Sequence, residues 1–148
     1  MENNTTSFLD RVESLKKLFT LSITDEAKYT KIIELGSMLI SMNPQDMTEK
    51  NLIAGCQSLL YLKVDLEDGK LLFKAHSDAL ISRGLAALLI HVYSGLTPYT
   101  ILKNPPTFLQ ELNLLKNLSP SRSNGVASIY LKMQQLSIKS LSNLVSSL

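Results

Sequence analysis

The single cysteine of this 148-residue chain, Cys56, lies in the segment NLIAGCQS at residues 51–58. A thiolate there would be a nucleophile, because the ionised sulfur is the form that attacks electrophiles and other sulfur atoms. Gly55 precedes Cys56, and a glycine favours a turn or an unusual backbone conformation at that point. The alternative is a small buried hydrophobic residue, since free cysteine is among the most buried residue types. The residues alone leave both roles open.

Two histidines, His76 and His91, are the other candidates for chemistry. Together with one cysteine they supply no ligand pair at metal spacing, so we predict no metal site. His91 lies in the apolar stretch LLIHVY, which predicts a core or half-buried position. His76 could be the general base of a hydrolase or transferase that uses Cys56 as nucleophile. The strand register described below places His76 opposite Tyr61, too far from Cys56 for direct proton transfer unless the loop folds back.

Composition excludes several classes of function. Lys plus Arg number 15 and Asp plus Glu 13, a net charge of +2, with no basic cluster, so nucleic acid is not an expected partner. The longest apolar stretch, LAALLIHVY, is shorter than the roughly 20 residues of a membrane span, and the N-terminus shows no signal peptide. One cysteine cannot form an intrachain disulfide, which fits a reducing compartment. We therefore expect a cytoplasmic protein, and, without a glycine-rich phosphate motif, no nucleotide cofactor.

The strongest local signal is a β-hairpin over about residues 58–76. Apolar and polar residues alternate there, and Asp68-Gly69 is typical of a two-residue turn, in which Glu67 faces Lys70. That register gathers one apolar face, consisting of Leu60, Leu62, Val64, Leu66, Leu71, Phe73 and Ala75. Two strands alone are marginal in water, so this face must lie on helices.

The remaining segments predict those helices from apolar periodicity and capping residues. The expected helices are one over residues 8–19, one from Thr24 to Ile40, one capped by Ser77 or Asp78 and ending near Gly95, a short one from Pro98, one with a Thr107–Gln110 capping box, and one from Ser119-Pro120 to the C-terminus. The fold class is α+β, a small antiparallel sheet packed against several helices, in a single domain of residues 1–148.

Five segments, taken in order, resemble the SufE family of sulfur-acceptor proteins in iron–sulfur cluster assembly. They are YTKIIELG (29–36), NLIAGCQS (51–58), SDALISRGLAALL (77–89), LTP (96–98) and LSPSRSNG (118–125). The resemblance covers about residues 25–135 and implies a SufE/IscU-like fold. Two features depart from the family pattern, His76 before Ser-Asp-Ala and the strand LLYL after the cysteine motif, and both bear on partner preference.

The resemblance also implies a mechanism. A SufS-type cysteine desulfurase, which holds the pyridoxal phosphate, would carry a persulfide, and Cys56 would accept its sulfur, stimulate the desulfurase and pass the sulfur to a SufB-containing scaffold. The chain itself would need no cofactor and would be a carrier rather than a stand-alone enzyme. The alternatives are the cysteine hydrolase or transferase above and a structural binding module with an inert Cys56.

The resemblance assigns supporting roles to four residues near Cys56. Gly55 and Gln57 would shape the cysteine loop, while Asp78 and Arg122 would lie around it or at the desulfurase contact. Arg122 could hold a thiolate or persulfide anion by charge. The alternatives are that Asp78 only caps a helix and that Arg122 only joins a surface ion pair. We also expect the resting loop to turn the Cys56 side chain inward and to open on docking, which would protect the sulfur between partners.

Overall fold

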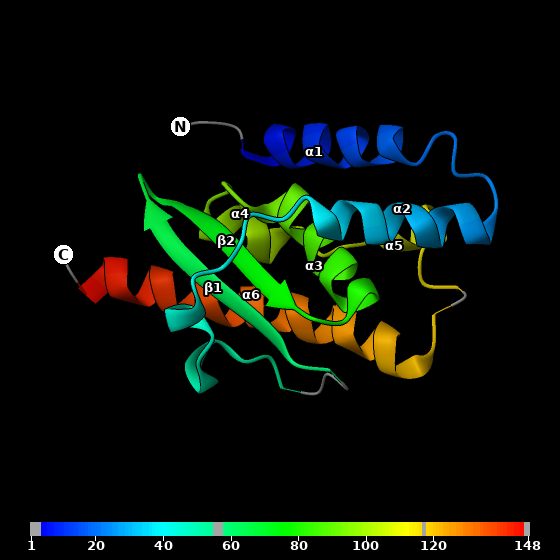
Figure 1. Cartoon of the computed structure of the whole chain (residues 1–148). Coiled ribbons are helices and arrows are strands. Elements are labelled where there is room, and N and C mark those ends of the chain that lie inside the picture. Colours follow the sequence, from blue (N-terminus) through cyan, green and yellow to red (C-terminus); the bar gives the residue numbers. More distant parts are fainter. Residues whose placement is uncertain (1–3, 55–57, 117, 147–148) are drawn as a thin grey trace.

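The computed structural model describes residues 4–54, 58–116 and 118–146, and within them it contains six α-helices, two 3-10 helices and one two-stranded antiparallel sheet. In chain order these are α1 (Asn4–Leu18), α2 (Asp25–Ser37), η1 (Pro44–Asp46), η2 (Glu49–Asn51), β1 (Leu60–Glu67), β2 (Lys70–Ser77), α3 (Leu80–Tyr93), α4 (Pro98–Lys103), α5 (Phe108–Glu111) and α6 (Pro120–Ser146). Figure 1 shows α1 and α2 at the top, the hairpin crossing the front, and the long α6 running along the bottom. The predicted α+β class is confirmed.

The hairpin has the predicted register. Glu67 pairs with Lys70 beside the turn, and Leu60 pairs with Ser77 at the other end. Asp68 and Gly69 both have positive φ, 51° and 76°, as the expected two-residue turn requires. The apolar face packs on helices, because β2 contacts α3 and β1 contacts α6. The tip of the hairpin extends beyond these helices, so that Leu66 is 48% exposed.

Both edges of the sheet are partly covered by other segments. On the β1 side, Leu52 forms an antiparallel bridge with Tyr61. On the β2 side, Leu71 forms a second bridge with Leu96, and the backbone N–H of Phe73 donates to Ser94 Oγ. These contacts tie the hairpin to the chain before it and to the end of α3.

A cluster of four aromatic rings fills the centre of the core. Phe8 of α1, Tyr93 of α3, Phe108 of α5 and Tyr130 of α6 lie with ring centroids 5.3–6.3 Å apart. The Tyr93 hydroxyl donates to the carbonyl of Asn104, and the Tyr130 hydroxyl to that of Ile101, both at 2.7 Å. Both hydroxyls therefore make a hydrogen bond in the core, which offsets the free-energy cost of removing them from water.

Helices α2 and α3 approach at a pair of glycines. A Cβ atom added to Gly84 would lie 2.2 Å from the carbonyl oxygen of Ile32, and one added to Gly36 would lie 2.8 Å from the Gly84 nitrogen. Only residues without a side chain allow two backbones to lie this close. This crossing fixes the position of α3, whose first turns line the cavity described below.

The first two helices largely follow the sequence prediction. The predicted apolar stripe of α1 is buried, and Thr24 caps α2 by accepting a hydrogen bond from the Ala27 backbone N–H at 3.0 Å. The predicted extension of α2 to Ile40 is wrong, because the helix ends at Ser37. The backbone N–H groups of Met38 and Leu39 donate to carbonyls three residues earlier, and this tighter turn ends the helix. Ile40 lies beyond it and is 73% exposed.

Two predicted helix caps are also wrong. Thr107 already has a helical backbone and makes no side-chain cap, so the capping box does not form, and α5 is only a short helix, Phe108–Glu111, after two prolines. At α3 the N-cap residue is Ala79, not Ser77 or Asp78. Ser77 instead accepts from the Ala79 backbone N–H at 3.2 Å, one position before the helix.

Candidate functional site

The cysteine motif lies between two well-anchored chain segments. Gly55, Cys56 and Gln57 are outside the described residues, and so is the predicted inward orientation of the Cys56 side chain. On either side of them, the backbone N–H of Ile53 donates to the carbonyl of Leu60 at 2.8 Å, so the chain enters and leaves this segment side by side. Both Ile53 and Leu60 are buried in the core.

The chain just after the motif is tied to α3. Ser58 Oγ lies 3.0 Å from Ser82 Oγ, and Ser77 Oγ donates to the carbonyl of Leu59 at 2.7 Å. Ser58 follows Cys56 by two positions, a length of chain that can span at most about 7 Å. The surroundings of Ser58 are therefore within reach of the cysteine thiol.

Ser58 lines a cavity of about 220 Å³ between α3 and the N-terminal half of α6. The cavity has an apolar floor and a polar rim, and its lining consists of Ser58, Leu60, Ala79, Ile81, Ser82, Leu85, Ser121, Arg122, Gly125 and Ile129. The start of a long helix carries a partial positive charge, and Arg122 adds a full one. A cavity with this lining can accommodate a small anionic or soft, polarisable group.

Arg122 extends from the first turn of α6 across the ring of Tyr29 on α2. Its guanidinium carbon lies 5.7 Å from the ring centroid, a cation–π contact. Among the residues that the structure describes, Arg122 takes part in no ion pair, so the alternative role in a surface ion pair is not supported there. Arg122 therefore both lines the cavity and stacks on Tyr29 beside it.

Asp78 and His76 pair with each other at the end of β2. His76 Nε2 lies 3.2 Å from Asp78 Oδ1, and the Asp78 side chain is 98% exposed. Asp78 therefore does not cap α3, and it does not line the cavity, although its neighbour Ala79 does. His76 pairs with Tyr61 across the hairpin as predicted. Whether it reaches the thiol lies outside the described residues.

Four of the five segments that resemble the family meet at this end of the molecule. Segments 51–58, 77–89 and 118–125 supply Ser58, Ser82 and Arg122 to the cavity, and segment 29–36 supplies Tyr29 beneath Arg122. Figure 1 shows the start of β1, the start of α3 and the start of α6 at the same end. Sequence reasoning did not single out Ser82 or Tyr29. Both residues lie inside segments that resemble the family, 29–36 and 77–89, and this position was the signal in the sequence that could have identified them.

No group of three or more metal-ligating side chains occurs within residues 4–54, 58–116 and 118–146. No helix in the same part of the chain is long and apolar enough to cross a membrane. The predicted half-buried position of His91 is confirmed, with its Nε2 atom 3.3 Å from Ser14 Oγ of α1.

We expect His91 to make the stability of the fold depend on pH. Burial, and then the positive charge of Arg11, hold the pKa of His91 below its ordinary value of 6.5. Near that pH the unfolded chain binds a proton that the folded chain does not, so the free energy of unfolding falls as the pH drops through 6.5 toward the folded pKa. We expect His91→Gln to flatten this fall, measured by urea denaturation between about pH 7.5 and about pH 5.5. An equally steep fall in both proteins would show that His91 is not responsible.

A family comparison agrees with the segments that meet at the cavity. Residues 13–137 match the family described as SufE, Fe-S metabolism associated domain. The chain belongs to the SufE family. This confirms the resemblance drawn from the five segments and places the chain in Fe–S metabolism.

Related proteins carry SufE-like names, and a solved structure shares the fold. An uncharacterized SufE-like protein of Synechocystis sp. is 39% identical over 116 residues, which are 78% of this chain and 73% of that protein. SufE-like protein 1, chloroplastic/mitochondrial, of Arabidopsis thaliana is 32% identical over 126 residues, 84% of this chain but only 34% of the plant protein. The solution structure of a hypothetical protein from Thermus thermophilus has a TM-score of 0.72 at 23% identity, over 92% of this chain and 96% of that one.

Proposed function

We propose that this SufE-family chain accepts sulfur on Cys56 from the persulfide of a SufS-type cysteine desulfurase, stimulates that enzyme, and delivers the sulfur to a SufB-containing cluster scaffold. The observation that carries the proposal is that three of the family segments line one cavity, to which the chain contributes Ser58, two positions after the cysteine. The cytoplasm is the proposed compartment, and the pyridoxal phosphate belongs to the desulfurase.

The transfer is an exchange between sulfur atoms with no net oxidation. The Cys56 thiolate attacks the outer sulfur of the desulfurase persulfide, a new S–S bond forms on Cys56, and the old S–S bond breaks. The desulfurase cysteine leaves as a thiolate. The rate of such an exchange depends on the thiolate fraction, the nucleophilicity and the accessibility of the attacking sulfur.

The cavity lining supports both the thiolate before transfer and the persulfide anion after it. Arg122 contributes a positive charge, and the hydrogen-bonded pair of Ser58 and Ser82 has one further hydroxyl proton to donate at the rim. The apolar floor, which includes Leu60 and Leu85, makes the surroundings less polar than bulk water, and charges interact more strongly there. A small soft anion is therefore better accommodated here than on an open surface.

Mass spectrometry of the chain tests the proposal directly. The protein is incubated with a SufS-type desulfurase and cysteine, and Cys56 should gain one sulfur atom that a reducing thiol removes. The control omits cysteine, so that the desulfurase carries no persulfide. An unmodified Cys56 in the presence of an active desulfurase would contradict the proposal.

Arg122→Ala should slow sulfur transfer about tenfold or more while changing stability little. The variant loses the cation at the cavity and one exposed cation–π contact, which is worth about 0.5–1 kcal/mol. Lys103→Ala is a matched control, because Lys103 Nζ lies 5.5 Å from the ring centroid of Tyr99, away from the cavity lining. Transfer rates come from the mass-spectrometric assay and stabilities from thermal melting. Equal transfer rates in the two variants would show that Arg122 has no role at the sulfur site.

A further inference from the structure

A second hollow, of about 490 Å³, lies at the other end of α6, and we call it the hairpin groove. It is bounded by the 44–51 segment, by the hairpin and by the C-terminal half of α6. Its lining residues are Gln45, Asp46, Thr48, Lys50, Asn51, Lys63, Val64, Leu66, Leu71, Leu136, Lys139, Ser140 and Asn143. None of them lines the cavity near Cys56. Arg122 and Lys139 are 17 positions apart on α6, so the two sites are about 25 Å apart along the helix.

One side of the hairpin groove is an open strand edge. The carbonyl of Leu60 points away from β2, because it accepts from Ile53. In an antiparallel strand the main-chain groups of alternate residues point the same way, so those of Leu62, Val64 and Leu66 also point away from β2. Within the part of the chain that the structure describes, no hydrogen bond is made to this outer edge after the Leu52–Tyr61 bridge.

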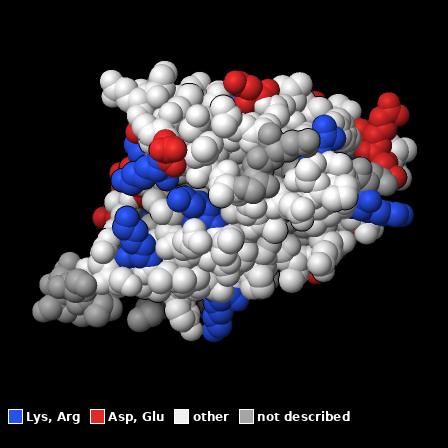
Figure 2. All heavy atoms as spheres, turned by 90° about the horizontal axis from the view of Figure 1, so that it is seen from below, with Lys and Arg blue, Asp and Glu red and all other residues white. Residues whose placement is uncertain are grey.

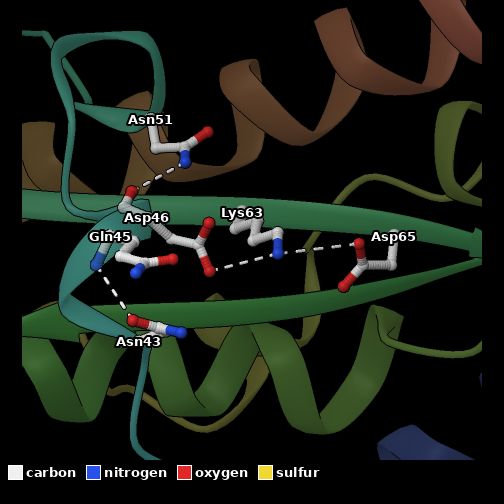
Figure 3. A network of polar contacts seen from close by, with 6 residues as sticks. All are labelled: Asn43, Gln45, Asp46, Asn51, Lys63 and Asp65. Atoms are coloured by element: carbon white, nitrogen blue, oxygen red, sulfur yellow. Dashed lines mark hydrogen bonds and ion pairs between the residues drawn. The ribbon is translucent and has the colours of Figure 1, made fainter.

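The facing wall of the groove is held in place by polar contacts. Lys63 Nζ lies 3.1 Å from Asp46 Oδ2 and 3.8 Å from Asp65 Oδ1. The Asn51 side-chain amide donates to the carbonyl of Asp46 at 2.8 Å. Figure 3 shows Lys63 between the two carboxylates, with Asn51 closing the 44–51 segment on itself. The groove is therefore bounded by a segment that these contacts hold in place.

The groove carries an excess of positive charge. The charge of Lys63 is offset by Asp46 and Asp65, whereas Lys50 and Lys139 are exposed and form no ion pair among the described residues. Figure 2 shows lysine and arginine side chains gathered toward the left end of the lower face, with acidic side chains at their border. The same groove is lined by apolar residues, which include Val64 and Leu136.

We propose that the hairpin groove binds an acidic, extended segment of a partner protein, which adds a third strand to the open edge of β1. Strand addition supplies main-chain hydrogen bonds along the edge, and side-chain contacts supply specificity. Acidic side chains of the added strand meet Lys50 and Lys139, and its apolar side chains meet the floor. A second copy of this chain fits less well, because edge-to-edge pairing would bring the same lysines together.

The binding probe is a fluorescein-labelled, end-capped peptide of alternating glutamate and valine, titrated by fluorescence anisotropy. Binding should be saturable and should weaken as ionic strength rises. Lys50→Glu combined with Lys139→Glu should weaken it at least about tenfold by reversing the local charge. Lys17→Glu combined with Lys103→Glu is the matched control, since both lysines are exposed and lie outside the groove.

A second pair of variants tests the strand edge itself. Leu66→Pro removes one outward N–H without touching the ladder to β2, and proline is tolerated on such an edge. It should weaken peptide binding, whereas Leu66→Ala should weaken it less, and circular dichroism checks that both variants fold. Two further peptides of the same sequence carry N-methyl groups on alternate residues, one on the odd and one on the even positions. Only the peptide whose unmethylated N–H groups face β1 should bind, because only alternate N–H groups of an added strand point toward its neighbour.

Three results would overturn the proposal. One is the absence of saturable binding up to about 1 mM, the weak end of specific recognition. Another is equal weakening in the groove and control lysine variants. The third is a dimer, detected by analytical ultracentrifugation, that Leu66→Pro dissociates, because a second copy would then be the occupant. Sulfur transfer to Cys56 is measured in parallel, and it should be unchanged by the lysine variants, so the two sites are tested separately.

Discussion

Cys56→Ser should accept no sulfur and should no longer stimulate the desulfurase, with transfer reduced at least about 100-fold. A serine hydroxyl is not ionised near neutral pH and cannot form the S–S bond that holds the transferred sulfur. The chain contains no other cysteine that could replace it. The measurements are the mass-spectrometric assay and the rate at which the desulfurase produces alanine from cysteine.

Moving the thiol to a neighbouring position tests whether sulfur transfer needs a cysteine at position 56 or only an accessible thiol nearby. Ala54 is exposed and lies two positions before Cys56, so Ala54→Cys in the Cys56→Ser background supplies an accessible thiol nearby. We expect this double variant to remain inactive, because the new thiol lies on the other side of the motif from Ser58 and the cavity. Circular dichroism confirms that both proteins fold. Undiminished stimulation of the desulfurase by Cys56→Ser would contradict the carrier proposal.

The hairpin could be predicted residue by residue because its signals are local. A period of two in hydrophobicity and the Asp68-Gly69 turn together fix which residues pair and which face is buried. The caps of α3 and α5 could not be predicted as reliably. Whether Thr107 acts as a cap depends on the path of the chain through the two prolines before it, which a capping pattern does not encode.

The cavity and the hairpin groove were beyond prediction for a different reason. Ser58, Ser82 and Arg122 are far apart in the sequence, and they meet only because α3 and α6 pack against each other. The stacking of Arg122 on Tyr29 also depends on the position of α2. A resemblance to a family identified the segments that matter, but it did not give the distances between them or the open edge of β1.

Gly84→Ala should reduce the free energy of unfolding by about 3 kcal/mol, and the melting temperature by about 10 °C. An alanine inside a helix is favoured over glycine by up to about 1 kcal/mol, so helix propensity alone predicts the opposite sign. The new Cβ atom would lie 2.2 Å from the carbonyl oxygen of Ile32, and a backbone atom cannot rotate away as a side chain can. We therefore expect the steric cost to exceed the gain in propensity, with α2 and α3 moving apart.

The matched control is Gly69→Ala in the hairpin turn. Gly69 has a φ of 76° and nothing within 4 Å of the position of a Cβ atom, so the substitution there costs only backbone strain, about 1–2 kcal/mol. Urea denaturation of the three proteins gives the comparison. Because α3 also carries Ser82 and Leu85 of the cavity lining, Gly84→Ala should slow sulfur transfer as well, whereas Gly69→Ala should not. A Gly84→Ala protein as stable as the wild type would show that the helices separate at little cost, and the close crossing would then not be what positions the cavity.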